Sequence, residues 1–230
     1  GYRHDISLNL SPGIGRQSLT FQTLEIDVRK YLRIKTDYTL AARVMLGKSF
    51  GPQAQKFFLG GVPYWLFGLG ETGGKDDSGQ FRQVILDNDN QSLLQDIYFT
   101  EYAMPLRGSR YAERVGTNVI LTNFEIRFPF INYLALGFPL KVIFGNIRGH
   151  AFLDVGAAWD DPREFSNAAV FDDKYGATVP SGSTPFVAGF GVGTKINLGY
   201  FLLRIDTAWD KNPDGRYSRP QYYFSLGPDW

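Results

Sequence analysis

The few residues of this chain that could do chemistry include a histidine and a carboxylate in IRGHAFLDVGAAWD, residues 147–160. His150 and Asp154 could belong to a hydrolytic triad or bind a metal ion, but two groups on one segment are too few for either. GFGVGTK (189–195) is glycine-rich like a dinucleotide-binding loop, yet it lacks the strand–turn–helix context of that motif. The sequence therefore predicts no catalytic residues and no metal ligands here.

Two further short motifs each lack a glycine that their function requires. GKS at 47–49 lacks the first glycine of a phosphate-binding loop, because Ala42 stands at that position. DNDNQ (87–91) is acidic enough to attract calcium, but Ser92 stands where a calcium loop of the EF-hand type needs glycine. We interpret it as a solvated turn and predict no cofactor.

Composition narrows the class of protein. The 230 residues carry a formal net charge of +1, so bulk electrostatics give no reason to expect nucleic acid as a partner. Aromatic residues make up 16% of the chain, glycine occurs 26 times and cysteine is absent. No apolar run approaches the ~18 residues of a membrane-spanning helix. The opening GYRHDISLNL has no methionine and no signal peptide, so we expect a longer protein.

The segment 147–160 makes sense when it is read at the period of a β-strand. Arg148, His150 and Asp154 fall on one face, with Phe152 among them, and the opposite face is wholly non-polar. Seven other segments alternate in the same way: 5–11, 21–30, 37–46, 118–130, 186–196, 200–209 and 221–227. Most approach the ~9–11 residues of a tilted membrane-spanning strand.

This pattern predicts an all-β chain that supplies about eight strands of an antiparallel transmembrane β-barrel. Short connections are expected at 32–36, 131–146 and 197–199, and long ones at 48–116, 160–185 and 210–218. Outer-membrane barrels place short turns on the periplasmic side and long loops outside. A soluble β-sandwich or a lipocalin-like barrel also alternates, with its apolar face as the core, and remains an alternative at this point.

The polar faces favour an enclosed, filled interior. They carry charges of both signs, among them Glu125, and include Asn123 of the segment 118–130 and Tyr223 of the segment 221–227. One of them also includes the row Gly189, Gly191 and Gly193. Glycine in a strand lets other backbone approach closely. We therefore expect a polar lumen occupied by a loop that folds back into it.

The last strand adds a separate signal. QYYFSLGPDW is amphipathic and closes on Trp230, and it resembles the C-terminal signal by which bacterial outer-membrane proteins are recognised for insertion. Tyr222, Phe224 and Leu226 form the apolar side of this segment. We expect these residues to line one side of a lateral seam.

Four motifs then resemble a known family. FFLGG (57–61), PLRGSRY (105–111), NFEIRFPF (123–130) and FLDVG (152–156) look like the barrel of the BamA/TamA outer-membrane assembly superfamily, also called bacterial surface antigen. The resemblance covers about residues 55–230 and is greatest to the branch with an upstream TolB-like β-propeller. It implies a sixteen-stranded barrel, with residues 1–230 as its C-terminal barrel domain and 48–116 as a long, inward-folding extracellular loop.

The resemblance also implies a loop-lock inside the barrel. In the family, the arginine of an Arg-Gly motif at the loop tip pairs with acidic residues on the two following strands. Carried over by position, these residues are Arg107, Gly108, Glu125 and Asp154. Ser109 departs from the family pattern, which usually has phenylalanine or tyrosine there. An arginine suits the role because its planar fork bridges two carboxylates and stays charged.

The function implied is non-enzymatic assembly or translocation of outer-membrane proteins, in the bacterial outer membrane. An opened seam would offer an unpaired strand edge to an incoming strand. The expected partners are outer-membrane lipid, client outer-membrane proteins and other membrane-complex subunits. The alternative is a membrane anchor or passive pore for a periplasmic or surface domain such as a β-propeller.

Overall fold

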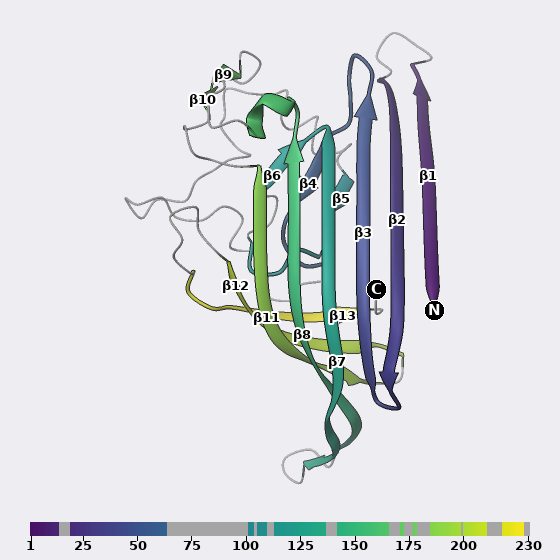
Figure 1. Ribbon diagram of the computed structural model, residues 1–230, viewed down its shortest axis with the longest axis vertical. Helices are drawn as coiled ribbons and strands as arrows, with labels where there is room; N and C mark the ends of the chain where they lie inside the picture. The colour runs from purple at the N-terminus through teal and green to yellow at the C-terminus, as the bar shows by residue number, and fades with distance from the viewer. Residues whose placement is uncertain are drawn as a thin grey trace.

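An eight-stranded antiparallel sheet dominates the structure (Figure 1). The computed structural model describes residues 1–13, 19–63, 101–103, 105–109, 113–136, 142–165, 171–172, 177–178, 185–198, 200–210 and 218–227. In sheet order the strands are β1 (Tyr2–Pro12), β2 (Thr20–Lys35), β3 (Tyr38–Phe50), β7 (Asn118–Leu136), β8 (Val142–Trp159), β11 (Phe186–Asn197), β12 (Leu202–Asp210) and β13 (Gln221–Gly227).

The eight strands predicted from alternation are all present, which confirms the all-β antiparallel fold class. Every neighbouring pair in the sheet is antiparallel, and β1 and β13 are its two edges in the described part of the chain. The sheet does not close on itself within these residues. No helix in the described ranges is long and apolar enough to cross a membrane.

Two of the expected connections were too long. Residues 131–136 continue β7 and 142–146 begin β8, so most of the predicted connection 131–146 is strand. The register between β7 and β8 shifts between Pro129 and Ile131. Such a bulge reverses the facing of later side chains and interrupts the alternation that the prediction followed. At 32–36 the expected turn begins later, because β2 runs to Lys35.

Short elements within the long connections were not predicted. A three-stranded sheet in the order β5-β4-β6 joins β4 (Phe57–Leu59), β5 (Glu101–Ala103) and β6 (Arg114–Gly116). The connection after β8 contains a 3-10 helix (Pro162–Phe165) and the pair β9 (Phe171–Asp172) and β10 (Ala177–Thr178). Elements of two to four residues are too short to show a period in sequence.

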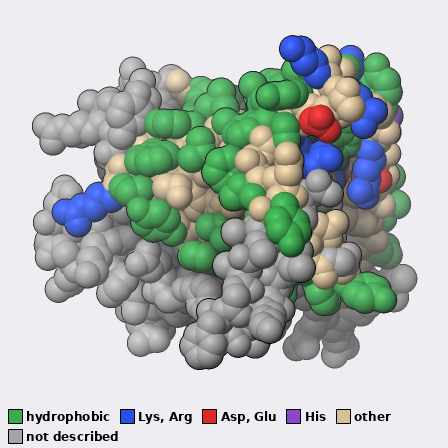
Figure 2. Space-filling view, turned by 90° about the horizontal axis from the view of Figure 1, so that it is seen from below, with side chains coloured by type: hydrophobic (Ala, Val, Ile, Leu, Met, Phe, Trp, Pro, Cys, Tyr) green, Lys and Arg blue, Asp and Glu red, His purple; other side chains and the backbone are tan. Residues whose placement is uncertain are grey.

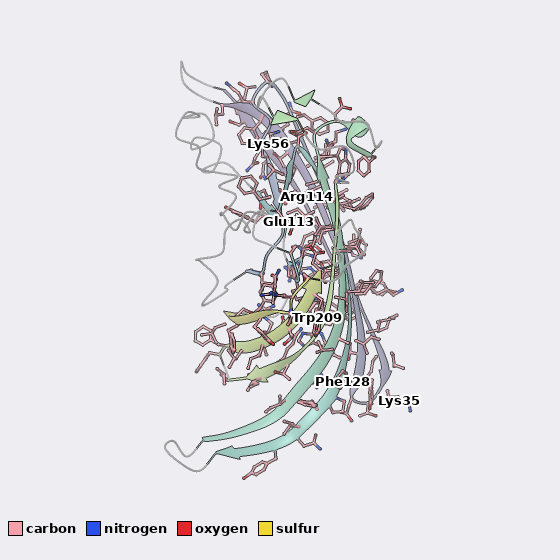
Figure 3. All side chains as sticks on the ribbon, turned by 90° about the vertical axis from the view of Figure 1, so that its left-hand side faces the viewer. Lys35, Lys56, Glu113, Arg114, Phe128 and Trp209 are labelled. Carbon is pink, nitrogen blue, oxygen red and sulfur yellow. The ribbon has the colours of Figure 1, made fainter. Side chains whose placement is uncertain are left out.

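The strand ends that flank the long connections lie at one end of the sheet. The chain runs back and forth through neighbouring strands, so β3, β8 and β12 end there and β7, β11 and β13 begin there, opposite the short connection 36–37 (Figure 1). Figure 3 shows Lys56, Glu113 and Arg114 toward the long-connection end and Lys35 at the other. This asymmetry matches the predicted order of loops.

The two faces of the sheet meet different surroundings. On the outer face Phe124, Ile126 and Leu153 keep 46%, 48% and 44% of their surface exposed, whereas Glu125 and Asp154 on the inner face are fully buried. Seen from one end, hydrophobic side chains gather over much of the described surface (Figure 2). A β-sandwich has the reverse arrangement, with its apolar face buried. The structure therefore contradicts the sandwich alternative.

The interior contains an apolar cluster between the loop and the sheet. Phe57, Leu59 and Leu106 of the loop are completely buried with Val119 and Leu121 of β7. Burying such side chains gains about 1.5–3 kcal/mol each. The described parts of the loop 51–117 are thus held against the inner face of the sheet by hydrophobic packing as well as by the polar contacts described below.

A substitution at Gly116 tests how closely β6 of that loop packs against β8. A methyl group at this position would lie 2.3 Å from the backbone nitrogen of Trp159, so Gly116→Ala forces β6 away from β8. We expect a loss of about 1–3 kcal/mol in the free energy of unfolding and faster protease cleavage within 51–117. Gly1→Ala is the control, because nothing lies within 4 Å of that position. Equal cleavage rates for the two variants would contradict the close seating.

Candidate functional site

The tip of the inward loop is a tight turn at residues 106–109. Paired backbone hydrogen bonds join Leu106 to Gly61, with N···O distances of 3.0 and 3.3 Å. The Ser109 hydroxyl donates to the Leu106 carbonyl at 2.7 Å, and Gly108 takes a φ of 92°. This φ lies in the left-handed region that glycine adopts without strain. The serine that departs from the family pattern therefore closes the turn.

Arg107 projects from this turn onto the inner face of β7 and β8. Its Nε and Nη2 donate to the two carboxylate oxygens of Asp154 at 2.7 and 2.9 Å, and Nη1 donates to Glu125 Oε2 at 3.1 Å. The backbone N–H of Arg107 adds a bond to Asp154 at 3.0 Å. The guanidinium also lies 3.5 Å from the centre of the Phe152 ring. Each of the three guanidinium nitrogens thus donates a hydrogen bond to a carboxylate. These bonds replace contacts with water, because only 2% of the residue is exposed.

Electrostatics keep this guanidinium charged. Burial is the largest single influence and disfavours the charged form, but the charge and hydrogen bonds of Asp154 together with the charge of Glu125 outweigh it and raise the pKa of Arg107 above its ordinary value. The resulting ion pairs are shielded from water, so each partner depends on the other for compensation.

Strand register explains why these carboxylates converge. Asn123 of β7 lies opposite Asp154 of β8, and Glu125 lies opposite Phe152, so both acids share the inner face on neighbouring strands. Asn123 donates to Asp154 Oδ1 at 2.8 Å and to the Pro105 carbonyl at 2.7 Å. Sequence reasoning missed Asn123 as a contributor, although it named its place on the polar face.

Glu125 also compensates two other cations. Lys195 Nζ of β11 and Arg127 Nε of β7 each donate to Glu125 Oε1 at 2.6 Å. A single carboxylate thus joins the loop tip to side chains of two strands. Nearby, His150 Nε2 lies 2.8 Å from Asp206 Oδ1. In the described ranges, no group of three or more histidine, aspartate or glutamate side chains could hold a metal ion.

The glycine row on β11 provides space for the tip only at its first member. A Cβ at Gly189 would lie 1.7 Å from the Arg107 carbonyl oxygen, so the loop backbone rests directly on this residue. At Gly191 and Gly193 the nearest groups belong to β12, namely the Thr207 carbonyl and the Asp206 carboxylate. The expectation of close backbone approach is therefore correct, but the loop touches one glycine rather than three.

Asp160 holds the base of the same loop. Its carboxylate accepts a hydrogen bond from the backbone N–H of Thr117 at 2.7 Å and pairs with the ammonium of Lys56. Lys56 precedes β4 and Thr117 precedes β7, so one side chain ties both ends of the inward loop. Nothing in the sequence distinguished Asp160 from other polar residues at a strand end.

The predicted seam residues lie apart from the lock. Tyr222 and Phe224 are exposed on the outer face of β13, and Leu226 is half-buried there. Trp230, residues 87–91 and the end of the PLRGSRY motif lie outside the described residues. The structure thus brings together Arg107, Gly108, Glu125 and Asp154, and separates them from the residues expected at the seam.

One residue of β13 nevertheless reaches the lock. The hydroxyl of Tyr223 accepts a hydrogen bond from the Gly108 N–H at 2.9 Å and lies 3.2 Å from the Ser109 carbonyl oxygen. Sequence analysis placed Tyr223 on the polar face of the last strand but gave it no role. A buried tyrosine usually needs a partner for its hydroxyl, which was the available signal.

Comparison with known proteins supports the resemblance found in the motifs. The family model of the Omp85 superfamily domain matches residues 1–230. No curated protein matches the chain.

The lock predicts a large effect of removing one buried carboxylate. Glu125→Gln keeps the shape of the side chain but leaves Arg107, Lys195 and Arg127 without this charge, so we expect a loss of about 3–5 kcal/mol in the free energy of unfolding. Asp5→Asn is the matched control, because Asp5 forms an exposed ion pair with Arg3 and should lose less than ~1 kcal/mol. Denaturant unfolding in detergent measures both. Similar losses would show that the buried network adds no stability.

Gly189 predicts a local effect at the tip. Gly189→Ala places a methyl group against the Arg107 carbonyl and should push the turn off β11. Because the chain has no cysteine, Ser109→Cys supplies a single buried thiol whose maleimide labelling reports this movement. Labelling should rise several-fold in Gly189→Ala and stay unchanged in Val192→Ala, an outward-facing change on the same strand. Unchanged labelling in both would contradict the contact.

Proposed function

Because this chain belongs to the Omp85 superfamily, we propose that it forms part of the wall of a barrel that inserts or translocates other outer-membrane proteins. Members of the superfamily are bacterial outer-membrane β-barrel proteins of assembly and translocation systems, and the chain is located in that membrane. The specific activity, insertion of client strands at a lateral seam, is our proposal. It requires no catalytic residue.

The observation that carries the proposal is the buried lock at Arg107. Its three side-chain bonds to Asp154 and Glu125 secure the turn 105–109 on the inner face of the sheet, where a passive pore would have water. A loop fastened by a few strong contacts can have two positions, seated and released. Such a bistable element suits a machine that changes shape during its cycle.

The expected site of client contact is the edge of β13. Within the described sheet the strand neighbour of β13 is β12, on one side, and the other side of β13 is the edge where we propose that a client strand pairs. An exposed edge templates an added strand by β-augmentation. Tyr222, Phe224 and Leu226 lie on the apolar side of this strand and, with Trp230 beyond it, would border the seam.

Lipid is the second partner in this proposal. The apolar outer face, with Phe124, Ile126 and Leu153, is suited to hydrocarbon, since outer-membrane strands alternate apolar side chains outward and polar ones inward. The charged inner face, where Asp27 binds Arg29 and Arg43 at 2.7 Å, then faces the lumen. Both faces have the chemistry that insertion of the sheet in a membrane requires.

Site-specific photo-crosslinking in cells tests the proposed activity. A photoreactive phenylalanine analogue replaces Tyr222 on β13 in the full-length protein, and in a second strain it replaces Leu153 on β8 as the matched control. Both positions are exposed on the outer face. If client strands pair at the β13 edge, position 222 should form adducts with newly made outer-membrane proteins and position 153 should not.

The anchor or passive-pore alternative gives the opposite result. An anchor for a periplasmic or surface domain has no reason to contact nascent outer-membrane proteins at either position. Depletion of the protein would then leave the levels of other outer-membrane proteins unchanged. Absence of client adducts at position 222, together with normal levels after depletion, would overturn the proposal.

A further inference from the structure

The loop tip is attached to an edge strand as well as to the centre of the sheet. Tyr223 of β13 is 1% exposed and belongs to a buried cluster with Val62 of the loop, Phe152 of β8 and Ala208 of β12. Its side chain therefore reaches inward from the edge of the described sheet to the packed interior. The two described edges differ in this respect, because β13 buries every second residue from Tyr223 to Gly227 whereas β1 has almost all its residues exposed.

The hydroxyl of Tyr223 is bound to the turn that carries Arg107. It accepts from the Gly108 N–H at 2.9 Å, and its own proton is shared between the Ser109 carbonyl at 3.2 Å and Gln221 Oε1 at 2.6 Å. Gly108 has no room to move toward the sheet, since a Cβ there would lie 2.7 Å from the Trp209 carbonyl oxygen of β12. The turn is thus held between β12 and the tyrosine.

A continuous set of contacts joins this hydroxyl to the ion pairs of the lock. Gly108 follows Arg107 directly in the chain, and Phe152, whose ring lies under the Arg107 guanidinium, belongs to the same buried cluster as Tyr223. If Arg107 leaves Asp154 and Glu125, the Gly108 N–H must move with it. The Tyr223 hydroxyl then loses its partner from the loop.

We propose that Tyr223 is a positioning residue that couples the Arg107 lock to the edge strand β13. With the lock seated, the tip holds β13 inward in addition to the β12 ladder. With the lock released, β13 loses this attachment to the loop tip and separates more readily from β12. This inference rests on the proposed function for its biological role, in which β13 borders the seam, but the coupling itself is a property of the fold.

Amide hydrogen exchange in the full-length protein, purified in detergent, tests the coupling. Tyr223→Phe removes the hydroxyl and keeps the ring, so the amides of 221–227 should exchange about fivefold to thirtyfold faster. Tyr222→Phe is the matched control, because it removes a hydroxyl from the neighbouring, outward-facing residue and should leave exchange in 221–227 unchanged. Equal exchange in the two variants would overturn the proposal.

A double-variant comparison separates coupling from a purely structural role. Arg107→Lys loses the bidentate fork and should also accelerate exchange in 221–227, although residue 107 lies on another segment. In the Tyr223→Phe background, Arg107→Lys should add no further acceleration, because the connection is already broken. Independent, multiplying effects would show that the two residues act separately and would contradict the proposal.

The outcomes also distinguish this inference from the proposed function. If Tyr223→Phe accelerates exchange in β13 but position 222 forms no client adducts, the coupling stands and the insertion activity fails. If position 222 forms adducts and Tyr223→Phe leaves exchange unchanged, the activity stands and the coupling fails.

Discussion

A guanidinium without contact to water is tolerated only where carboxylates compensate its charge, and this requirement organises the interior of the molecule. Arg107 needs Asp154 and Glu125 on one face of two adjacent strands, and Glu125 in turn compensates Lys195 and Arg127. The contacts of the turn, the register of β7 with β8 and the absence of a side chain at Gly189 all serve this arrangement. Hydrophobic packing of the loop alone would hold it inside but would not fix where its tip lies.

The same constraint explains the inverted distribution of polarity. Charged side chains concentrate on the concave, loop-filled side, whereas apolar side chains remain exposed on the other side. In water this distribution would leave a large apolar surface uncovered. In a bilayer it places each group in a suitable solvent, since the polar groups are compensated by one another. The membrane thus takes the part that a second layer of protein has in a soluble domain.

Much of this arrangement was predictable because alternation is strong in strands with two unlike faces. The pattern predicted all eight strands and put Glu125 and Asp154 on the inner face, while the family resemblance supplied Arg107 as their partner. Tyr223 and Asn123 were missed because their roles depend on which part of the loop arrives opposite them. The bulge at Pro129 and Ile131 was missed because a single unpaired residue leaves only a brief break in the pattern. Contacts between a loop and a distant strand have no period by which a sequence reveals them.

The loop is attached to two carboxylates of one segment, Asp154 within β8 and Asp160 directly after it. Asp154 receives the tip and Asp160 the base, and the six residue steps from one to the other span about 20 Å along an extended chain. The distance between these two carboxylates along the chain therefore sets how far the loop tip lies from the loop base. Because successive side chains of a strand alternate between its faces, inserting one residue in this interval would put the two carboxylates on opposite faces, whereas inserting two would keep them on one face. Each insertion of two residues would move the tip and the base apart by roughly 7 Å.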